Sequence, residues 1–170
     1  VSDLHALTNQ NAISIETSNV IIDLNGHTLY GAGTTVGSNG VGIYAAINQN
    51  NIHVFNGVIR DFRGNGIYLY GTNQQVSEMK IFGNNSNGIY IGNASGMIWS
   101  NFVTQNGGAG IYAPSSIIRD NICTNNSIGL DGRSGSVITG NICRNNRSNG
   151  IQIESDSVVI GNMCNTNGGS

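Results

Sequence analysis

Short apolar segments alternate with short polar segments along the whole chain. Within an apolar segment the two faces alternate residue by residue, as in Gly66-Ile67-Tyr68-Leu69, where Ile67 should point inward and Tyr68 outward. A period of two is typical of a strand with one buried face, and segments of this length are short for helices. The pattern therefore predicts many short strands and an all-β fold.

The strands recur at a regular interval, which is marked by a Gly followed by an apolar residue. The spacings between successive markers are 24, 22, 22, 19 and 21 residues, and the markers are Gly42, Gly66, Gly88, Gly110, Gly129 and Gly150. This interval is shorter than the unit of about 33–34 residues in ankyrin and tetratricopeptide repeats. One coil cannot bury its own apolar face, so stacked coils must supply the core. We expect a β-solenoid of about eight coils of about 21 residues, forming a single domain over residues 1–170.

Residues at equal offsets in successive coils should form inward columns. Three apolar columns are predicted: Ile67, Ile89, Ile111, Leu130 and Ile151; Val54, Val76, Ile98, Ile118, Ile138 and Val159; and Ile59, Ile81, Val103, Cys123, Cys143 and Cys164. Asn recurs in step at two corners: Asn101, Asn121, Asn141 and Asn162, and then Asn84, Asn106, Asn126, Asn146 and Asn167. Asn tolerates left-handed backbone angles, and its amide can bond the amide one coil away. Two asparagine ladders are therefore expected.

Two parts of the sequence resemble a known group of proteins. Residues 18–29, SNVIIDLNGHTL, resemble the opening coil of bacterial right-handed parallel β-helix repeat proteins. Later Gly-Asn-x-Cys-x-Asn-Asn units, such as residues 140–146, resemble repeats of the same group, which includes pectate-lyase-like and carbohydrate-binding or sugar-hydrolase-type β-helices. The resemblance implies a right-handed parallel β-helix. It implies no single activity, because this fold carries lyases, hydrolases, epimerases and phage tailspikes.

Charge and hydropathy exclude some partners. Only 9% of residues are charged, the net charge is −2, and Lys and Arg form no cluster, which argues against nucleic acid and anionic membranes. No apolar run approaches the roughly 20 residues of a membrane span. Because the chain opens on Val1-Ser2-Asp3 without a signal peptide and its last coil stops at Gly168-Gly169-Ser170, we expect a piece of a longer protein.

The cysteines and histidines offer few candidates for chemistry. The three Cys share one inward column and are expected to act as small hydrophobes, although neighbouring coils are close enough for a disulfide. If Leu24 stacks on Val54, Asp23 lies beside His53, as an acid/base pair or a surface ion pair. No cofactor is predicted, and Ca²⁺ lacks support because no Asp-rich loop motif is present.

An outward column of tyrosines is the main candidate for binding. Tyr44, Tyr68, Tyr90 and Tyr112 each follow the inward apolar residue of their coil, and Asp131 and Gln152 continue the column. Tyr offers a flat apolar ring and a hydrogen-bonding tip, which suits sugars and protein partners. The alternative is that aromatic residues simply favour exposed strand positions and stack on each other.

The polar end of this column is the candidate for catalysis. Asp131 and Glu154 lie on neighbouring coils with an offset of two residues, which places their carboxyl groups at a diagonal of about 8 Å. This separation falls in the range of roughly 6.5–9.5 Å found for inverting glycosidases. Arg133 should stack directly on Glu154 and pair with it, which would instead make an ordinary surface ion pair.

Three functional hypotheses follow. The first is an extracellular, periplasmic or cell-surface module that binds a polysaccharide or glycan, or serves as a scaffold, without catalysis in this segment. The second is a polysaccharide hydrolase or lyase that uses Asp131 and Glu154. The third is a self-assembling structural protein, because open solenoid ends expose unpaired strand edges that can pair end to end or in a homo-oligomer.

Overall fold

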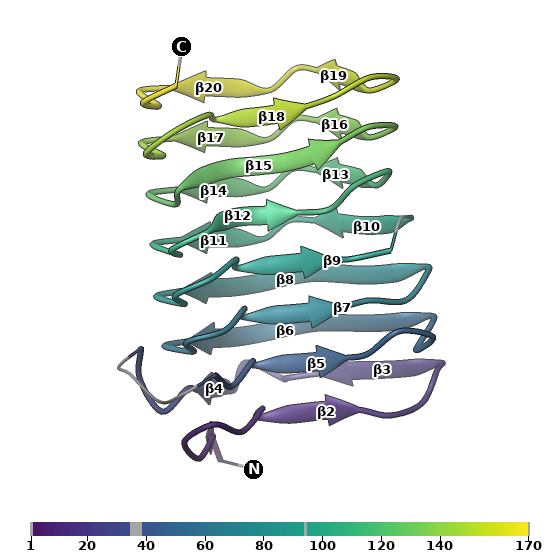
Figure 1. The fold of residues 1–170 in the computed structure, drawn as a ribbon, viewed down its shortest axis with the longest axis vertical. Coiled ribbons are helices and arrows are strands. Elements are labelled where there is room, and N and C mark those ends of the chain that lie inside the picture. Colours follow the sequence, from purple (N-terminus) through teal and green to yellow (C-terminus); the bar gives the residue numbers. More distant parts are fainter. Residues whose placement is uncertain (1, 35–38, 94, 170) are drawn as a thin grey trace.

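The computed structural model describes residues 2–34, 39–93 and 95–169 and shows a parallel β-solenoid (Figure 1). The coils stack along one axis, with the two termini at opposite ends, and the described residues contain strands and turns without a helix. Within these residues no helix has the length and hydropathy of a membrane span. The solenoid has about seven turns, not eight. The difference arises because the long connection between β4 (Thr28–Tyr30) and β5 (Ile43–Ala45) consumes part of the chain.

Two parallel sheets form the walls of the solenoid. One has seven strands, which are β2 (Ile13–Ile15), β5 (Ile43–Ala45), β7 (Ile67–Leu69), β9 (Ile89–Ile91), β12 (Ala109–Tyr112), β15 (Ile128–Arg133) and β18 (Ile151–Ile153). The other has thirteen, which are β1 (Leu4–His5), β3 (Val20–Asp23), β4 (Thr28–Tyr30), β6 (Ile52–Arg60), β8 (Gln74–Phe82), β10 (Gly96–Trp99), β11 (Phe102–Thr104), β13 (Ile117–Arg119), β14 (Ile122–Thr124), β16 (Val137–Thr139), β17 (Ile142–Arg144), β19 (Val158–Ile160) and β20 (Met163–Asn165). The long strands β6 and β8 run through a corner at which later coils break into two strands (Figure 1).

The three predicted apolar columns lie in the core, except that Val159 and Cys164 of the last coil are exposed. In the first, Ile67, Ile89 and Ile111 are in register and inaccessible to solvent. The second and third columns are in register in the same way, through pairs such as Val54 with Val76 and Cys123 with Cys143. The alternation of inward and outward positions predicted these columns but missed a fourth buried column on the seven-stranded sheet, formed by Ile15, Ala45, Leu69 and Ile91.

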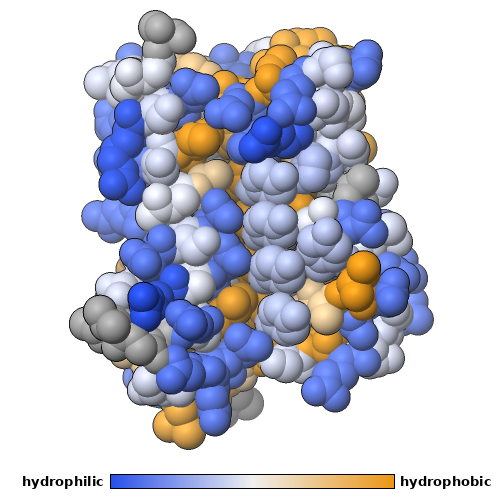
Figure 2. Space-filling model, viewed as in Figure 1, coloured by the Kyte–Doolittle hydropathy of each residue, from blue (hydrophilic) through white to orange (hydrophobic). Residues whose placement is uncertain are grey.

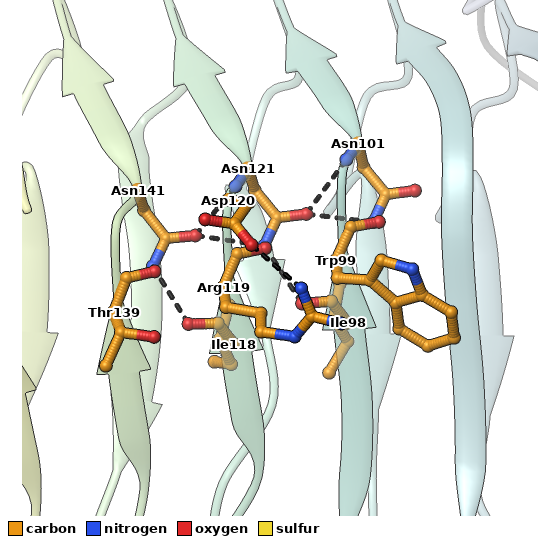
Figure 3. Close-up of polar contacts among 9 residues, drawn as sticks. All are labelled: Ile98, Trp99, Asn101, Ile118, Arg119, Asp120, Asn121, Thr139 and Asn141. Atoms are coloured by element: carbon orange, nitrogen blue, oxygen red, sulfur yellow. Dashed lines mark hydrogen bonds and ion pairs between the residues drawn. The ribbon is translucent and has the colours of Figure 1, made fainter.

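The asparagine ladders are also present, and Figure 3 shows one of them. The side-chain oxygen of Asn121 accepts hydrogen bonds from the backbone N–H (3.0 Å) and the side-chain amide (2.9 Å) of Asn101. The amide nitrogen of Asn121 donates to the carbonyls of Ile98 (3.0 Å) and Arg119 (2.9 Å). Each rung thus satisfies polar groups of two coils in the interior, where an unpaired group would be costly.

Each ladder ends on an apolar side chain. Met79 lies one coil before Asn101 in one ladder, and Phe62 lies one coil before Asn84 in the other. Both side chains are almost fully buried. Their backbone N–H groups donate to the side-chain oxygens of Asn101 (3.0 Å) and Asn84 (2.9 Å). The first rung therefore has a donor from the preceding coil, although that coil carries no Asn there.

The expected stacking of Leu24 on Val54 is wrong, because Ile22 pairs with Val54 and Asp23 pairs with Phe55. Leu24 lies just past the end of β3, where it packs at the corner over Gly57 of the next coil. A Cβ at Gly57 would lie 2.3 Å from the Cβ of Leu24, so Leu24 fills the space that a larger residue would need. Asp23 consequently lies away from the predicted histidine, and its carboxylate accepts hydrogen bonds from the Asn25 backbone and the Asn56 amide.

Candidate functional site

The tyrosine stripe, defined as Tyr44, Tyr68, Tyr90 and Tyr112, lies on the outward face of the seven-stranded sheet. The four residues occupy β5, β7, β9 and β12 and pair in exact strand register. Each side chain is partly exposed, while the residues on either side of it in the strand are buried. Figure 2 views this face and shows a column of near-neutral hydropathy, with strongly hydrophilic surface at its C-terminal end.

The four rings stack on each other along the solenoid axis. Ring centroids are 5.4 Å apart between Tyr44 and Tyr68, 4.9 Å between Tyr68 and Tyr90, and 4.8 Å between Tyr90 and Tyr112. The planes of the last two pairs differ by 2° and 7°. Because neighbouring rings cover each other's faces, the stripe presents ring edges and hydroxyl groups to solvent.

A second outward column widens the stripe at its centre. The ring of Tyr70 lies 6.0 Å from the ring of Tyr68, with planes 17° apart. A Cβ at Gly92, at the same offset in the next coil, would lie 2.0 Å from an atom of the Tyr70 ring. The glycine therefore makes room for the ring. Tyr70 was not among the binding residues predicted from the sequence, although its position two residues after Tyr68 places it on the same face of the sheet.

The central hydroxyl groups of the stripe stay neutral. Burial, followed by the neighbouring tyrosines, raises the pKa of Tyr68 and of Tyr90 above the ordinary value of 10.0. Both groups are therefore protonated at physiological pH and can donate and accept hydrogen bonds. The stripe offers neutral hydrogen-bonding groups at regular intervals.

A cluster of two carboxylates and a guanidinium terminates the stripe. Arg133 Nη1 lies 2.7 Å from Glu154 Oε1, and Arg133 Nε lies 3.2 Å from Asp131 Oδ1. The Asp131 side chain is only 5% exposed, whereas that of Glu154 is 50% exposed. Ser134 Oγ donates a further hydrogen bond to Glu154. Arg133 thus lies between the two carboxylates that the sequence singled out, with a hydrogen bond to Glu154 and an ionic contact, not aligned as a hydrogen bond, to Asp131.

The predicted direct stacking of Arg133 on Glu154 is wrong, although the two residues do pair. A register shift between Asp131 and Arg133 places Arg133 opposite Ile153. Arg133 has a left-handed backbone (φ 51°), and the guanidinium reaches diagonally to the next residue along. A bulge of this kind re-aims a side chain without ending the strand pairing.

The two carboxyl groups have pKa values displaced in opposite directions. Burial raises the pKa of Asp131 above 3.8, although Arg133 opposes this shift. Hydrogen bonds from Arg133 and Ser134 lower the pKa of Glu154 below 4.5. Paired carboxyl groups with separated pKa values can in principle supply an acid and a base. Here the same cation contacts both of them.

The comparison with protein families decides the identity of the fold. Residues 65–170 match the family described as "right handed beta helix region", which is more than half of the chain. The chain belongs to this family. No curated protein and no solved structure matches the chain. The match covers the coils that carry both ladders, and it gives the hand of the helix.

Two of the three cysteines of this right-handed β-helix line its core. Cys123 and Cys143 are buried and unbonded, whereas Cys164 is exposed, and none of them forms a disulfide. The hydrogen bond with Cys143, followed by burial, raises the pKa of Cys123 well above 9.0. A buried protonated thiol is a poor nucleophile and packs as a small hydrophobe. In the described part of the chain, no three His, Cys, Asp or Glu side chains gather as metal ligands would.

His53 lies on the opposite sheet of the β-helix from the stripe. Its ring is 4.8 Å from that of Phe55 and 5.5 Å from that of Trp99, and its Nε2 is 3.1 Å from Ser77 Oγ. Burial lowers the pKa of His53 below 6.5. Ser77 is itself only 1% exposed, whereas His53 is partly exposed beside the two aromatic rings.

Proposed function

We propose that this β-helix binds polysaccharide through the tyrosine stripe. The observation that carries the proposal is the in-register stack of four partly exposed rings, with centroids 4.8–5.4 Å apart. Tyr combines apolar contact area with a hydrogen-bonding tip, as a sugar ligand requires. Rings that are already held by their neighbours lose little conformational freedom when a ligand binds. The same proposal places the protein outside the cytoplasm, in contact with extracellular or cell-surface polysaccharides.

Removal of the two central rings tests the assignment of this face. We expect the double variant Tyr68→Ala/Tyr90→Ala to bind polysaccharide at least about tenfold more weakly, because hot-spot aromatic residues dominate binding energy. Gel retardation in polysaccharide-containing gels measures the loss, and circular dichroism verifies the fold. Tyr30→Ala is the matched control, because Tyr30 lies in β4 of the other sheet, where it stacks on His5. Equal retardation of parent and double variant would show that this face does not bind.

A second candidate function is hydrolysis by Asp131 and Glu154, because their carboxyl groups lie on either side of Arg133, at 3.2 and 2.7 Å, and their pKa values are displaced in opposite directions. In that account Asp131 donates a proton to the leaving oxygen and Glu154 activates water, as in an inverting glycoside hydrolase. Release of reducing ends by the parent protein, lost in both Asp131→Asn and Glu154→Gln, would support hydrolysis. Full activity of Asp131→Asn would exclude this pair.

A further inference from the structure

We infer that the tyrosine stripe takes a linear, uncharged polysaccharide in an extended conformation, lying along the solenoid axis with about one sugar unit per coil. This inference rests on the proposed function and specifies its ligand. It follows from the stacking of the rings, from the constant step between them and from the charges at the end of the stripe.

Ring stacking determines how a sugar can make contact. Tyr68 and Tyr90 each have a stacked ring on both sides, so neither can offer an open face to a single sugar. The accessible groups are one ring edge and one hydroxyl per coil. One sugar unit therefore makes few contacts, and affinity must accumulate over several coils.

The regular spacing of the tyrosine rings favours a ligand with an extended conformation. The rings repeat every 4.8–5.4 Å in a straight line, because the strands that carry them pair without a register shift from β5 to β9. An extended glycan chain advances by a similar distance per sugar unit and stays over the stripe. A chain that curls into a helix leaves the stripe after one or two coils.

Neutral groups flank the stripe. On one side lie Tyr70 and, farther along the same column, Pro114. On the side where β7 and β9 begin, the Asn87 amide donates to the Asn65 side-chain oxygen at 3.1 Å. A chain over the stripe therefore meets apolar edges, hydroxyl groups and carboxamides, which suit hydroxyl-rich sugars.

Charge selects against acidic polysaccharides. The guanidinium of Arg133 lies 5.8 Å from the ring of Tyr112, but it already contacts both Asp131 and Glu154. With both carboxyl groups ionised the cluster carries one net negative charge. Arg133 is therefore already paired with carboxylates of the protein. An acidic polysaccharide would be repelled by the net negative charge at this end of the stripe and would bind more weakly.

Titration calorimetry with defined oligosaccharides tests the inference. The probes are cello-oligosaccharides of two to six glucose units, which are extended and neutral, maltohexaose, which is neutral and curled, and hexagalacturonate, which is acidic. We expect affinity for the first series to rise up to about four units, one per tyrosine, and then to level off. Maltohexaose and hexagalacturonate should bind at least about tenfold more weakly than cellohexaose, a difference of about 1.4 kcal/mol. Tyr112→Ala, which shortens the stripe, should move the plateau to about three units.

Three outcomes would overturn the inference while leaving the proposed function intact. They are tighter binding of hexagalacturonate than of cellohexaose, equal affinity for cellobiose and cellohexaose, and failure of all cello-oligosaccharides to bind a protein that polysaccharide gels still retard. Absence of retardation of the parent protein in every polysaccharide gel would overturn the proposed function and the inference together.

Discussion

At the corners of this β-helix, single residues adopt left-handed backbone angles or hydrogen-bond buried backbone groups. Asn56, Glu78, Ser100 and Asp120 all have left-handed backbone angles at the corner of the thirteen-stranded sheet, and Gly140 continues the series. From the coil of Ser100 onward, an inward Asn follows each corner residue. Its side chain hydrogen-bonds the buried backbone groups of the adjacent coil. The ladder Asn residues could be found from the sequence because the Asn amide can both donate and accept along the ladder. The left-handed backbone expected for them is wrong, because the positive φ angles belong to the residues just before them, such as Ser100 and Asp120.

Removal of one rung should destabilise the fold strongly. Asn121→Ala would leave the backbone N–H of Asn101 and the Ile98 carbonyl without their partner in the interior. The Asn101 amide would keep the carbonyls of Val76 and Trp99 as partners. Each unsatisfied buried group costs about 1–3 kcal/mol, so we expect the two unpaired groups together to lower the free energy of unfolding by at least about 2 kcal/mol. Urea denaturation measures the loss. Asn85→Ala, at an exposed position, is the control and should change stability by less than about 0.5 kcal/mol. Similar losses in both variants would contradict the ladder's role.

The two carboxyl groups beside the stripe should affect stability with opposite signs. The lowered pKa of Glu154 means that ionised Glu154 stabilises the fold above about its ordinary value of 4.5, and this contribution disappears as the pH falls through the folded-state pKa. The raised pKa of Asp131 means that ionisation of this group opposes folding at neutral pH. At pH 7 we therefore expect Glu154→Gln to lower the Tm and Asp131→Asn to raise it.

Melting curves between pH 7 and pH 3 measure both differences. The destabilisation by Glu154→Gln should vanish in acid as the parent carboxyl group protonates, and the gain from Asp131→Asn should shrink as the pH approaches 3.8, the ordinary value for Asp. Shifts of the same sign in the two variants would be inconsistent with this account.

At the scale of the strand, the sequence could predict the columns but not their surface geometry. The period of two and the recurring Gly set which side chains point inward, and the register pairs confirm them. The bulge at Arg133 and the burial of Asp131 could not be predicted, because an outward position was assumed to be exposed. Likewise, a column of tyrosines in sequence does not reveal that neighbouring rings cover each other's faces.

The Gly before each inward apolar residue is required by close packing of coils. A Cβ at Gly88 would lie 2.4 Å from the Val103 side chain and 2.7 Å from the Gly110 carbonyl oxygen. We expect Gly88→Ala to cost roughly 1–3 kcal/mol or more through overpacking. At Gly161 the added Cβ meets open space but the φ of 67° disfavours it, so Gly161→Ala should cost only about 1–2 kcal/mol. Chemical denaturation compares the two, and a larger loss at Gly161 would refute the steric explanation.

At the scale of the molecule, the repeat predicted the β-solenoid, and the family match confirms a right-handed β-helix. The number of turns was overestimated because the average period ignores the long connection after β4. Function could not be read in the same way, since the fold accommodates many activities and the surface columns carry no complete catalytic set that the sequence could reveal. Self-association of the solenoid remains a prediction, which concentration-dependent light scattering would test.

Retention of the protein on polysaccharides, compared with that of the stripe variant, is the decisive test of carbohydrate binding by the tyrosine stripe. The purified parent protein and the Tyr68→Ala/Tyr90→Ala variant are exposed to a panel of neutral and acidic polysaccharides, and retention and released reducing ends are read from the same samples. The account predicts that the parent is retained by an uncharged linear polysaccharide without product release and that the variant is not retained. Equal retention of parent and variant, or retention of neither, would contradict it.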